Sequence, residues 1–374
     1  MSTPSQTTPA SASNLNSSQT TPASTSNLNS NSTSTSTLNP DSNITTTTTT
    51  WYPCGLLNGH ATHPYAIIIL NQPMNPNALD AVIDGAAVLV CADAGADRLY
   101  RYQKQYQSQN QSQNQNQIRT KVDHDESTKS RAKDQPKDHD HDPDQNQNQN
   151  QSSQKHHHSP SHSHRRNRLP DAIIGDLDSL SRVVEEHYRS RGVTVIQDPD
   201  QYSTDFTKCL KWIRRWCVEQ QQQQQQHQHQ HQHQQQHYND TIMDVVVIGG
   251  LGGRVDQGFS QIHHLYMAET DPNLLQGRIY LLSEQSLSFV LANGDNLIHV
   301  EPGYFEENVG IIPVLGRSLL TTHGLEWDVE QWPTQFGGQL STSNHIRSDE
   351  IQIAFQGPRP LFTMELDKRF ARGE

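Results

Sequence analysis

The chain has 374 residues and a formal net charge of −12 at pH 7, and only 32% of its residues are hydrophobic. Globular domains carry about 45–50% apolar residues, so much of this chain lies outside any hydrophobic core. The negative charge argues against a general nucleic-acid binder, and no stretch approaches the ~20 apolar residues of a membrane span. The four cysteines have no CxxC spacing, which fits reduced thiols in a cytoplasmic protein.

Three low-complexity segments interrupt the sequence. Residues 1–50 are almost entirely Ser, Thr, Asn, Gln, Pro and Ala, and residues 5–17 recur nearly verbatim as residues 18–30. Residues 103–168 are rich in Gln, Asn, Asp and His, and residues 220–237 are almost pure Gln and His. Polar repeats cannot bury apolar surface, so we expect a disordered tail and two loop insertions. About 240 residues remain, enough for one large domain or two small ones.

Short continuous apolar runs alternate with helical patterns in residues 51–275. Such runs are typical of strands buried on both faces of a parallel sheet. The alternation predicts a doubly wound α/β domain. The predicted strands are residues 66–70, 87–91, 172–174, 193–196 and 245–248, and the predicted helices are residues 77–85, 95–102, 181–191, 204–218 and 257–269.

Residues 276–374 have a different pattern, with closely spaced strands, turn signals and no helical periodicity. This pattern predicts a C-terminal antiparallel β-sandwich domain. The predicted strands are residues 279–282, 287–291, 296–300, 309–314, 318–322, 325–329, 350–355 and 361–366.

Two aspartates follow the predicted strand 172–174, where ligands bind in open α/β sheets. Asp176 and Asp178 are separated by one residue, so in extended backbone their carboxylates point the same way while Leu177 turns into the core. Such a pair suits a magnesium–nucleotide complex. The alternative is a solvated turn in which Asp178 or Ser179 caps a helix.

A third carboxylate follows the next predicted strand. Thr204 can cap the helix that begins there, and Asp205 then lies in its first turn, beside the positive end of the backbone dipoles. This position makes a site shared with Asp176 and Asp178 plausible. Asp93, which follows the strand 87–91, is either a further site carboxylate or a helix cap.

A glycine-rich loop, Gly249-Gly250-Leu251-Gly252-Gly253, follows the predicted strand 245–248. Glycines allow a ligand to approach the backbone closely, and amide groups at the next helix start can cradle phosphate oxygens. Arg254 adds a charged donor for the same oxygens. The loop does not have the spacing of a Walker A motif, so by itself it is a weak signal.

Taken in order, five motifs resemble those of the thiamine pyrophosphokinase (thiamine diphosphokinase) family, in a fungal-type form with low-complexity insertions. The resemblance covers nearly all of the core of about 240 residues and none of the low-complexity segments. The motifs are ADAGADRLY at 92–100, GDLDS at 175–179, Gln-x-x-Thr-Asp-Phe-Thr-Lys at 201–208, GGLGGRVDQ at 249–257 and STSN at 341–344.

The resemblance implies an enzyme that transfers pyrophosphate from ATP to the hydroxyl of thiamine, giving thiamine diphosphate and AMP. It also implies Mg²⁺ as cofactor, an α/β domain that binds ATP, a β-sandwich that binds thiamine, and a homodimer with active sites between subunits. Two other functions stay open: an ATP-dependent kinase or pyrophosphokinase for another alcohol, and a non-catalytic regulator that senses nucleotide or thiamine.

The same resemblance assigns roles to individual residues. Asp176, Asp178 and Asp205 are expected to bind Mg²⁺, and catalysis is expected to involve Asp178, Asp205, Lys208 and Arg254. The residues expected to line the nucleotide site besides Lys208 and Arg254 are Asp93, Gln201, Thr204, Asp256 and Gln257, and those expected on the thiamine side are Trp327, Ser341, Ser343 and Asn344.

Two positions qualify the resemblance. Trp327 offers a flat face for a cationic or aromatic ring, and the alternative is a strand residue in the sandwich core. Position 94 is Ala where the family commonly has Gly, which puts the backbone approach of a ligand there in doubt.

Overall fold

The computed structural model describes residues 47–105, 107–108, 167–228 and 242–370. Most of the predicted tail, most of the first predicted insertion and half of the second lie outside the described residues. The four cysteines are buried thiols without disulfide bonds, as predicted. None of the described helices is both long enough and apolar enough to cross a membrane.

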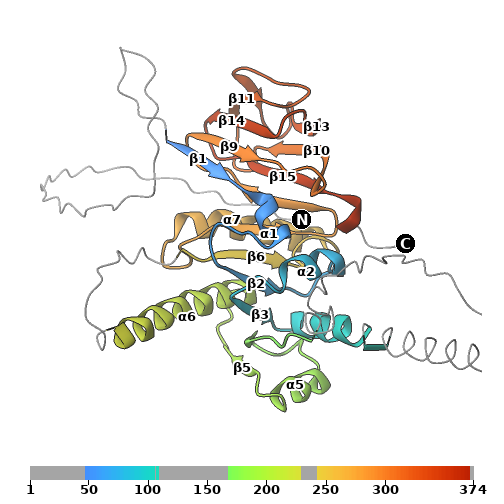
Figure 1. The fold of residues 1–374 in the computed structure, drawn as a ribbon, viewed down its shortest axis with the longest axis vertical. Coiled ribbons are helices and arrows are strands. Elements are labelled where there is room, and N and C mark those ends of the chain that lie inside the picture. Colours follow the sequence, from blue (N-terminus) through green and yellow to red (C-terminus); the bar gives the residue numbers. More distant parts are fainter. Residues whose placement is uncertain (1–46, 106, 109–166, 229–241, 371–374) are drawn as a thin grey trace, which may run out of the picture. The chain divides into compact units, whose positions relative to one another are not determined.

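Parallel strands form the N-terminal half of the fold, as the apolar runs predicted. Every residue of β2, β3, β4 and β6 is buried, which fits a sheet covered on both faces. The strand order β7-β6-β2-β3-β4-β5 places a topological switch point between β2 and β6 (Figure 1). The strands are β2 (Tyr65–Ile69), β3 (Val88–Ala92), β4 (Ala172–Gly175), β5 (Thr194–Gln197), β6 (Asp244–Ile248) and β7 (Ile279–Leu282).

Helices cover both faces of these strands, because successive strand residues point to opposite sides of the sheet. On one face Ile68 belongs to an apolar cluster with Phe206 of α6 and Leu265 of α7. On the other face Ile67 belongs to a second cluster with Leu79 of α2. The helices are α1 (Pro53–Asn58), α2 (Pro76–Val82), a helix over residues 95–105, α5 (Arg182–Arg189), α6 (Asp205–Gln228) and α7 (Val255–Thr270).

The C-terminal half is a β-rich domain of two sheets that enclose an apolar core. One sheet continues the parallel strands through β8 (Ser286–Val290), β15 (Leu361–Leu366), β10 (Phe305–Ile312) and β13 (Ser341–His345), all paired antiparallel. The second sheet has the order β1 (Thr48–Trp51), β9 (Asp295–His299), β14 (Glu350–Gln356), β11 (Ser318–His323) and β12 (Trp332–Thr334). Trp51 and Phe289 stack between the two sheets, with ring centroids 4.5 Å apart.

The two halves share one sheet. The change from parallel to antiparallel pairing lies later in the chain than the end of helical periodicity in the sequence. β7 pairs parallel with β6 and antiparallel with β8. The last parallel strand therefore lies beyond residue 275, where helical periodicity disappears. A strand buried on both faces gives the same apolar run whether its neighbour is parallel or antiparallel, so the sequence pattern cannot separate the two.

The structure also shows that the ends of the predicted low-complexity segments belong to the fold. Thr48–Trp51 forms β1, parallel to β9, although residues 48–50 were assigned to the tail. Threonine is polar in composition but favours strands, and Trp51 anchors the strand with 1% exposure. Gln103 is buried and donates to the Arg168 carbonyl, so both ends of the first insertion belong to the core. The Gln run extends α6 to Gln228, since glutamine is a good helix former.

Three smaller differences concern single elements. The predicted strand 325–329 is a turn region with one isolated bridge from Leu325 to Ile346. The short strands β12 and β13 were not predicted, because neither segment has an apolar alternation. The helix α1 was also missed, since Pro53 and Gly55 within it are turn signals in a single sequence.

Candidate functional site

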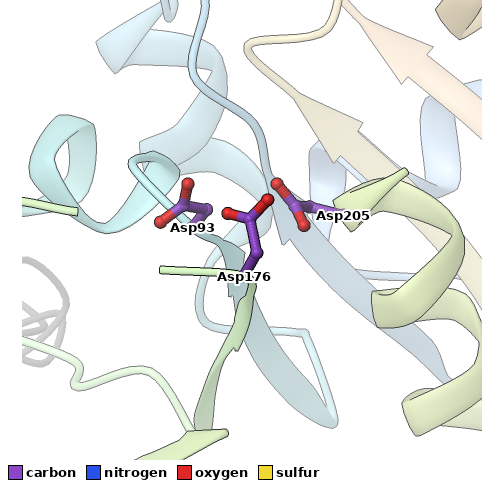
Figure 2. Close-up of side chains that lie close together, drawn as sticks. All are labelled: Asp93, Asp176 and Asp205. Atoms are coloured by element: carbon purple, nitrogen blue, oxygen red, sulfur yellow. The ribbon is translucent and has the colours of Figure 1, made fainter. Parts of the chain in front are cut away.

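Three carboxylates converge at the carboxyl ends of neighbouring parallel strands. Asp93 follows β3, Asp176 follows β4, and Asp205 opens α6 after β5. One ligand oxygen from each lies within 4.8 Å of the others, and Figure 2 shows the three side chains close together, with Asp176 between Asp93 and Asp205. Asp93 is buried, whereas the other two are partly exposed. This arrangement offers three carboxylate oxygens to one cation.

The backbone at the end of β4 lets the carboxylates meet. A Cβ on Gly175 would lie 2.7 Å from Asp93 Cβ and 3.2 Å from Asp205 Oδ1, so any side chain there would push the group apart. Asp93 has a φ of 44° and Leu177 a φ of 65°, both in the left-handed region. Aspartate tolerates this region better than most residues, whereas a leucine there is unusual.

Burial and like charge act together on Asp93. Burial, followed by the charge of Asp205, raises the pKa of Asp93 to about 6, although the Ser179 N–H bond opposes the shift. Asp93 Oδ1 is buried and has no hydrogen-bond partner among the described residues. A buried carboxylate oxygen without a donor is costly, and a bound cation would satisfy it.

One buried cation faces this group. Lys208 is 3% exposed, and its Nζ donates to Asp205 Oδ1 at 3.1 Å. Burial lowers the pKa of Lys208, but the hydrogen bond and charge of Asp205 outweigh it, so the net shift is upward. One ammonium against three carboxylates leaves a negative excess, and oxygen ligands of this kind suit Mg²⁺. The residues present therefore fit a divalent cation.

Asp178, predicted to bind metal, lies outside this group. Its carboxylate accepts a hydrogen bond from Ser179 Oγ at 2.8 Å, and its N–H donates to Asp176 Oδ1 at 3.2 Å. The bond from this N–H is the main cause that lowers the pKa of Asp176. The backbone is not extended here, because Leu177 is left-handed. The Asp178 side chain nevertheless contacts the Asp176 carboxylate, and this contact is a further cause of the lowered pKa of Asp176. The side chain of Gln201 also hydrogen-bonds Asp176 and joins the edge of the group.

The glycine-rich loop lies at the switch point between β2 and β6. Gly249 has a φ of 70°, and a Cβ there would lie 2.7 Å from the Leu70 carbonyl oxygen. Gln72 N–H donates to the Gly249 carbonyl at 3.1 Å. Arg254 precedes α7 and pairs with Asp256, Nη2 to Oδ2 at 2.5 Å, with both side chains largely exposed. The exposure of this ion pair leaves it accessible to a ligand at the loop.

The residues expected on the thiamine side form a separate surface at β13. Trp327 is 54% exposed, so the alternative of a core tryptophan does not hold. Asn344 is buried; its Oδ1 accepts from the Trp327 N–H at 3.1 Å and its Nδ2 donates to the Trp327 carbonyl at 3.0 Å. Asn344 thus fixes the backbone that carries the tryptophan ring. Ser341 and Ser343 lie on the same strand, with Ser343 exposed at a φ of 59°.

The two groups of predicted residues lie far apart within one chain. β13 is the first strand of the ten-stranded sheet formed by the described residues, whereas β3 and β4 are the eighth and ninth. Adjacent strands lie about 4.8 Å apart, so seven or eight steps correspond to roughly 30–40 Å. The structure brings together Asp93, Asp176, Asp205, Lys208 and Gln201, and separately Trp327, Ser341, Ser343 and Asn344.

One residue in this region was not anticipated from the sequence. His264 of α7 is buried, and its Nε2 lies 2.7 Å from Thr204 Oγ1, at the start of α6. Burial lowers the pKa of His264. A histidine in an amphipathic helix carries no signal that separates it from a core or surface residue, so a single sequence could not have identified it.

Comparison with known proteins finds related families and structures for both halves of the fold. Residues 79–275 match the family described as thiamin pyrophosphokinase, catalytic domain, and residues 295–359 match thiamin pyrophosphokinase, vitamin B1 binding domain. The chain is 32% identical to thiamine pyrophosphokinase of Saccharomyces cerevisiae over 206 residues, which are 48% of this chain and 64% of that protein. It is 31% identical to thiamine pyrophosphokinase 3 of Oryza sativa subsp. japonica over 200 residues, 53% of this chain and 66% of that protein. The chain thus spans just under two thirds of these relatives.

Solved structures share the fold. The crystal structure of yeast thiamin pyrophosphokinase superposes with a TM-score of 0.59 at 23% identity, covering 85% of this chain and 90% of that one. Thiamin pyrophosphokinase from Candida albicans superposes with a TM-score of 0.58 at 21% identity, covering 88% and 97%. Fungal and plant relatives match at nearly equal identity, so the fungal type stays a prediction.

Proposed function

The chain belongs to the thiamine pyrophosphokinase family, and on that basis we propose that it transfers the β,γ-pyrophosphoryl group of ATP to the hydroxyl of thiamine, giving thiamine diphosphate and AMP. The observation that carries the proposal is the cluster of three carboxylates, Asp93, Asp176 and Asp205, at the sheet edge. An alcohol is a weak nucleophile and the phosphate oxygens of ATP repel it, so the reaction needs concentrated positive charge.

Asp93, Asp176 and Asp205 are the residues that would hold Mg²⁺. The bound ion would neutralise phosphate charge and orient the phosphoryl group. The unpartnered Asp93 Oδ1 and the space left by Gly175 support this assignment. Asp178 remains a proposed metal ligand and catalytic residue, since its side chain contacts Asp176 at the edge of the three carboxylates.

The chain's own residues supply the rest of the charge and the binding surface. Lys208 and Arg254 would stabilise negative charge on the bridging and leaving oxygens. Backbone amides of the loop 249–253 would bind phosphate oxygens at the start of α7. The residues proposed to contact the nucleotide around them are Asp93, Gln201, Thr204, Asp256 and Gln257.

On the thiamine side, the exposed Trp327 ring would stack on the substrate, and Ser341 and Ser343 would donate hydrogen bonds. Because this surface and the carboxylates are roughly 30–40 Å apart in one chain, one molecule of thiamine cannot contact both. We therefore propose a homodimer in which the Trp327 surface of one subunit faces the carboxylates of its partner. The two-fold symmetry of such a dimer would complete two equal sites.

The direct test is AMP formation from ATP, measured with and without thiamine and with and without Mg²⁺. We expect AMP only when both are present. AMP release that requires a different alcohol would favour a kinase or pyrophosphokinase for that substrate. Binding of thiamine or nucleotide without turnover would favour the regulator. The cytoplasm stays the proposed compartment, supported by four buried thiols without disulfide bonds.

A further inference from the structure

The buried histidine His264 has one defined tautomer. Its Nδ1 lies 2.5 Å from the carbonyl oxygen of Ser260, one turn earlier in α7. A carbonyl oxygen can only accept a hydrogen bond, so Nδ1 carries the proton and donates it. In the neutral ring Nε2 is then an acceptor. The helix itself therefore determines which side of the ring faces its neighbours.

The acceptor side of this ring faces the start of α6. Nε2 lies 2.7 Å from Thr204 Oγ1 and 3.1 Å from Thr207 Oγ1. Thr204 Oγ1 accepts from the Thr207 N–H at 3.2 Å, which is the bond of a helix cap. The hydroxyl hydrogen of Thr204 is thus available to point at the histidine. The ring also stacks on Phe206, with centroids 4.7 Å apart.

The first turn of α6 carries two residues of the proposed Mg–nucleotide site. Lys208 N–H donates to the Thr204 carbonyl at 3.0 Å, and Lys208 Nζ donates to Asp205 Oδ1 at 3.1 Å. α7, which carries His264, begins directly after the glycine-rich loop. A hydrogen bond between His264 and Thr204 therefore joins the helix that follows the loop to the helix that presents Asp205.

We propose that His264 is a positioning residue that holds Thr204, and through it Asp205 and Lys208, at a fixed place relative to the loop 249–253. The inference rests on the proposed function in taking Mg–ATP as the ligand. It does not depend on thiamine being the acceptor. A nucleotide that contacts both the loop and the first turn of α6 would bind a preorganised site, and loosening the link would weaken that binding.

The test compares His264→Phe with His264→Gln in the full chain. Phenylalanine keeps a ring against Phe206 and loses the acceptor, whereas the amide oxygen of glutamine can still accept from Thr204. His263→Phe is the matched control, since His263 is exposed on the same helix and phenylalanine keeps a ring against His264, where the centroids of the two histidine rings lie 5.7 Å apart. Binding is measured by calorimetry with Mg²⁺ and α,β-methylene ATP, which cannot release the pyrophosphoryl group.

We expect His264→Phe to weaken nucleotide binding about tenfold, the effect of one lost hydrogen bond of ordinary strength, and His264→Gln to recover most of it. KM for ATP should rise in parallel, while KM for thiamine stays unchanged. Unchanged nucleotide binding in His264→Phe would overturn the proposal. Equal losses in both variants that follow their loss of thermal stability would assign His264 to packing alone and overturn it too.

The failure of the two proposals can be told apart. If the wild-type chain forms no AMP with thiamine, yet His264→Phe weakens nucleotide binding and His264→Gln restores it, the thiamine reaction fails and the positioning role stands. If the wild-type chain binds no Mg–nucleotide at all, both proposals fail.

Discussion

The cluster of Asp93, Asp176 and Asp205 differs in structure from the surface formed by Trp327, Ser341 and Ser343. The first lies on buried parallel strands, where charge is concentrated beyond what its single lysine balances, and burial with like charge raises the pKa of Asp93 to about 6. The second lies beside the edge strand β13, where Asn344 fixes the backbone of the exposed Trp327 and the His345 ring packs against its side chain, with ring centroids 4.9 Å apart. The first region thus holds unfavourable charge that a ligand would relieve, while the second holds apolar surface that a ligand would cover.

The largest expected effect comes from Asp205, which would lose its role as an anionic ligand in Asp205→Asn. We expect kcat to fall roughly 10²–10³-fold, because stabilisation of charge on the transferred group is lost. AMP release at saturating substrates measures it. Asp349→Asn, an exposed aspartate on the sandwich, is the matched control and should leave kcat unchanged.

Asp178→Asn sharpens the same test, because Asp178 lies outside the group of three. A smaller loss than in Asp205→Asn would agree with the geometry. An equal loss would mean that Asp178 also binds the ion. Near-normal turnover in Asp205→Asn would remove the metal assignment.

Asp93→Asn tests whether the buried charge of Asp93 lowers the free energy of unfolding. The folded-state pKa of Asp93 is raised, from 3.8 to about 6, so ionising Asp93 destabilises the fold. This cost is absent below about pH 4, grows as the pH rises toward 6 and is complete above it. In EDTA at pH 8 the asparagine variant should therefore be more stable than wild type by up to about 3 kcal/mol, with no difference near pH 4. Urea unfolding at both pH values measures it.

Asparagine suits this position, because it tolerates a positive φ and its oxygen can accept from Ser179. The variant should also lose most of its stabilisation by added Mg²⁺. Equal stability of the two proteins at pH 8 would show that Asp93 carries no such cost.

Trp327→Ala tests the exposed surface, where we expect activity to change and stability to stay. Loss of stacking on a cationic ring should raise KM for thiamine about 10–30-fold, with KM for ATP unchanged. Phe336→Ala is a suitable control, since Phe336 is equally exposed on the sandwich. An unchanged KM for thiamine would place the substrate elsewhere.

The smallest expected effect is a partial recovery of activity when variants of the two regions are mixed. Asp205→Asn and Trp327→Ala chains are mixed, allowed to exchange subunits and assayed at thiamine far below the raised KM of Trp327→Ala, where each variant is weakly active alone. If each site takes one region from each subunit, half of the dimers are mixed and each has one intact site, so activity should return to about a quarter of wild type. No recovery after confirmed exchange would contradict a shared site.

Much of the fold was predictable, because strands buried on both faces leave continuous apolar runs. The order of motifs likewise predicted which loops meet at the sheet edge. Which carboxylates converge was not predictable, because the meeting of Asp93 with Asp176 and Asp205 depends on the left-handed backbone at Leu177 and the close approach at Gly175. Both features follow from tertiary contacts rather than from local spacing. The position of His264 depends on how α6 and α7 pack, which a single sequence does not encode locally.

The shared sheet has a mechanical consequence. Strand β7 hydrogen-bonds to β6 on one side and β8 on the other, so a continuous ladder joins the two halves without a linker. Bending such a ladder would break several backbone hydrogen bonds at once, which makes the hinge closure used by many kinases an unsuitable way to bring ATP and thiamine together. Formation of the dimer, rather than closure of a hinge, would then bring the two regions together. Specific activity should then fall on dilution, at chain concentrations below the dissociation constant of the dimer.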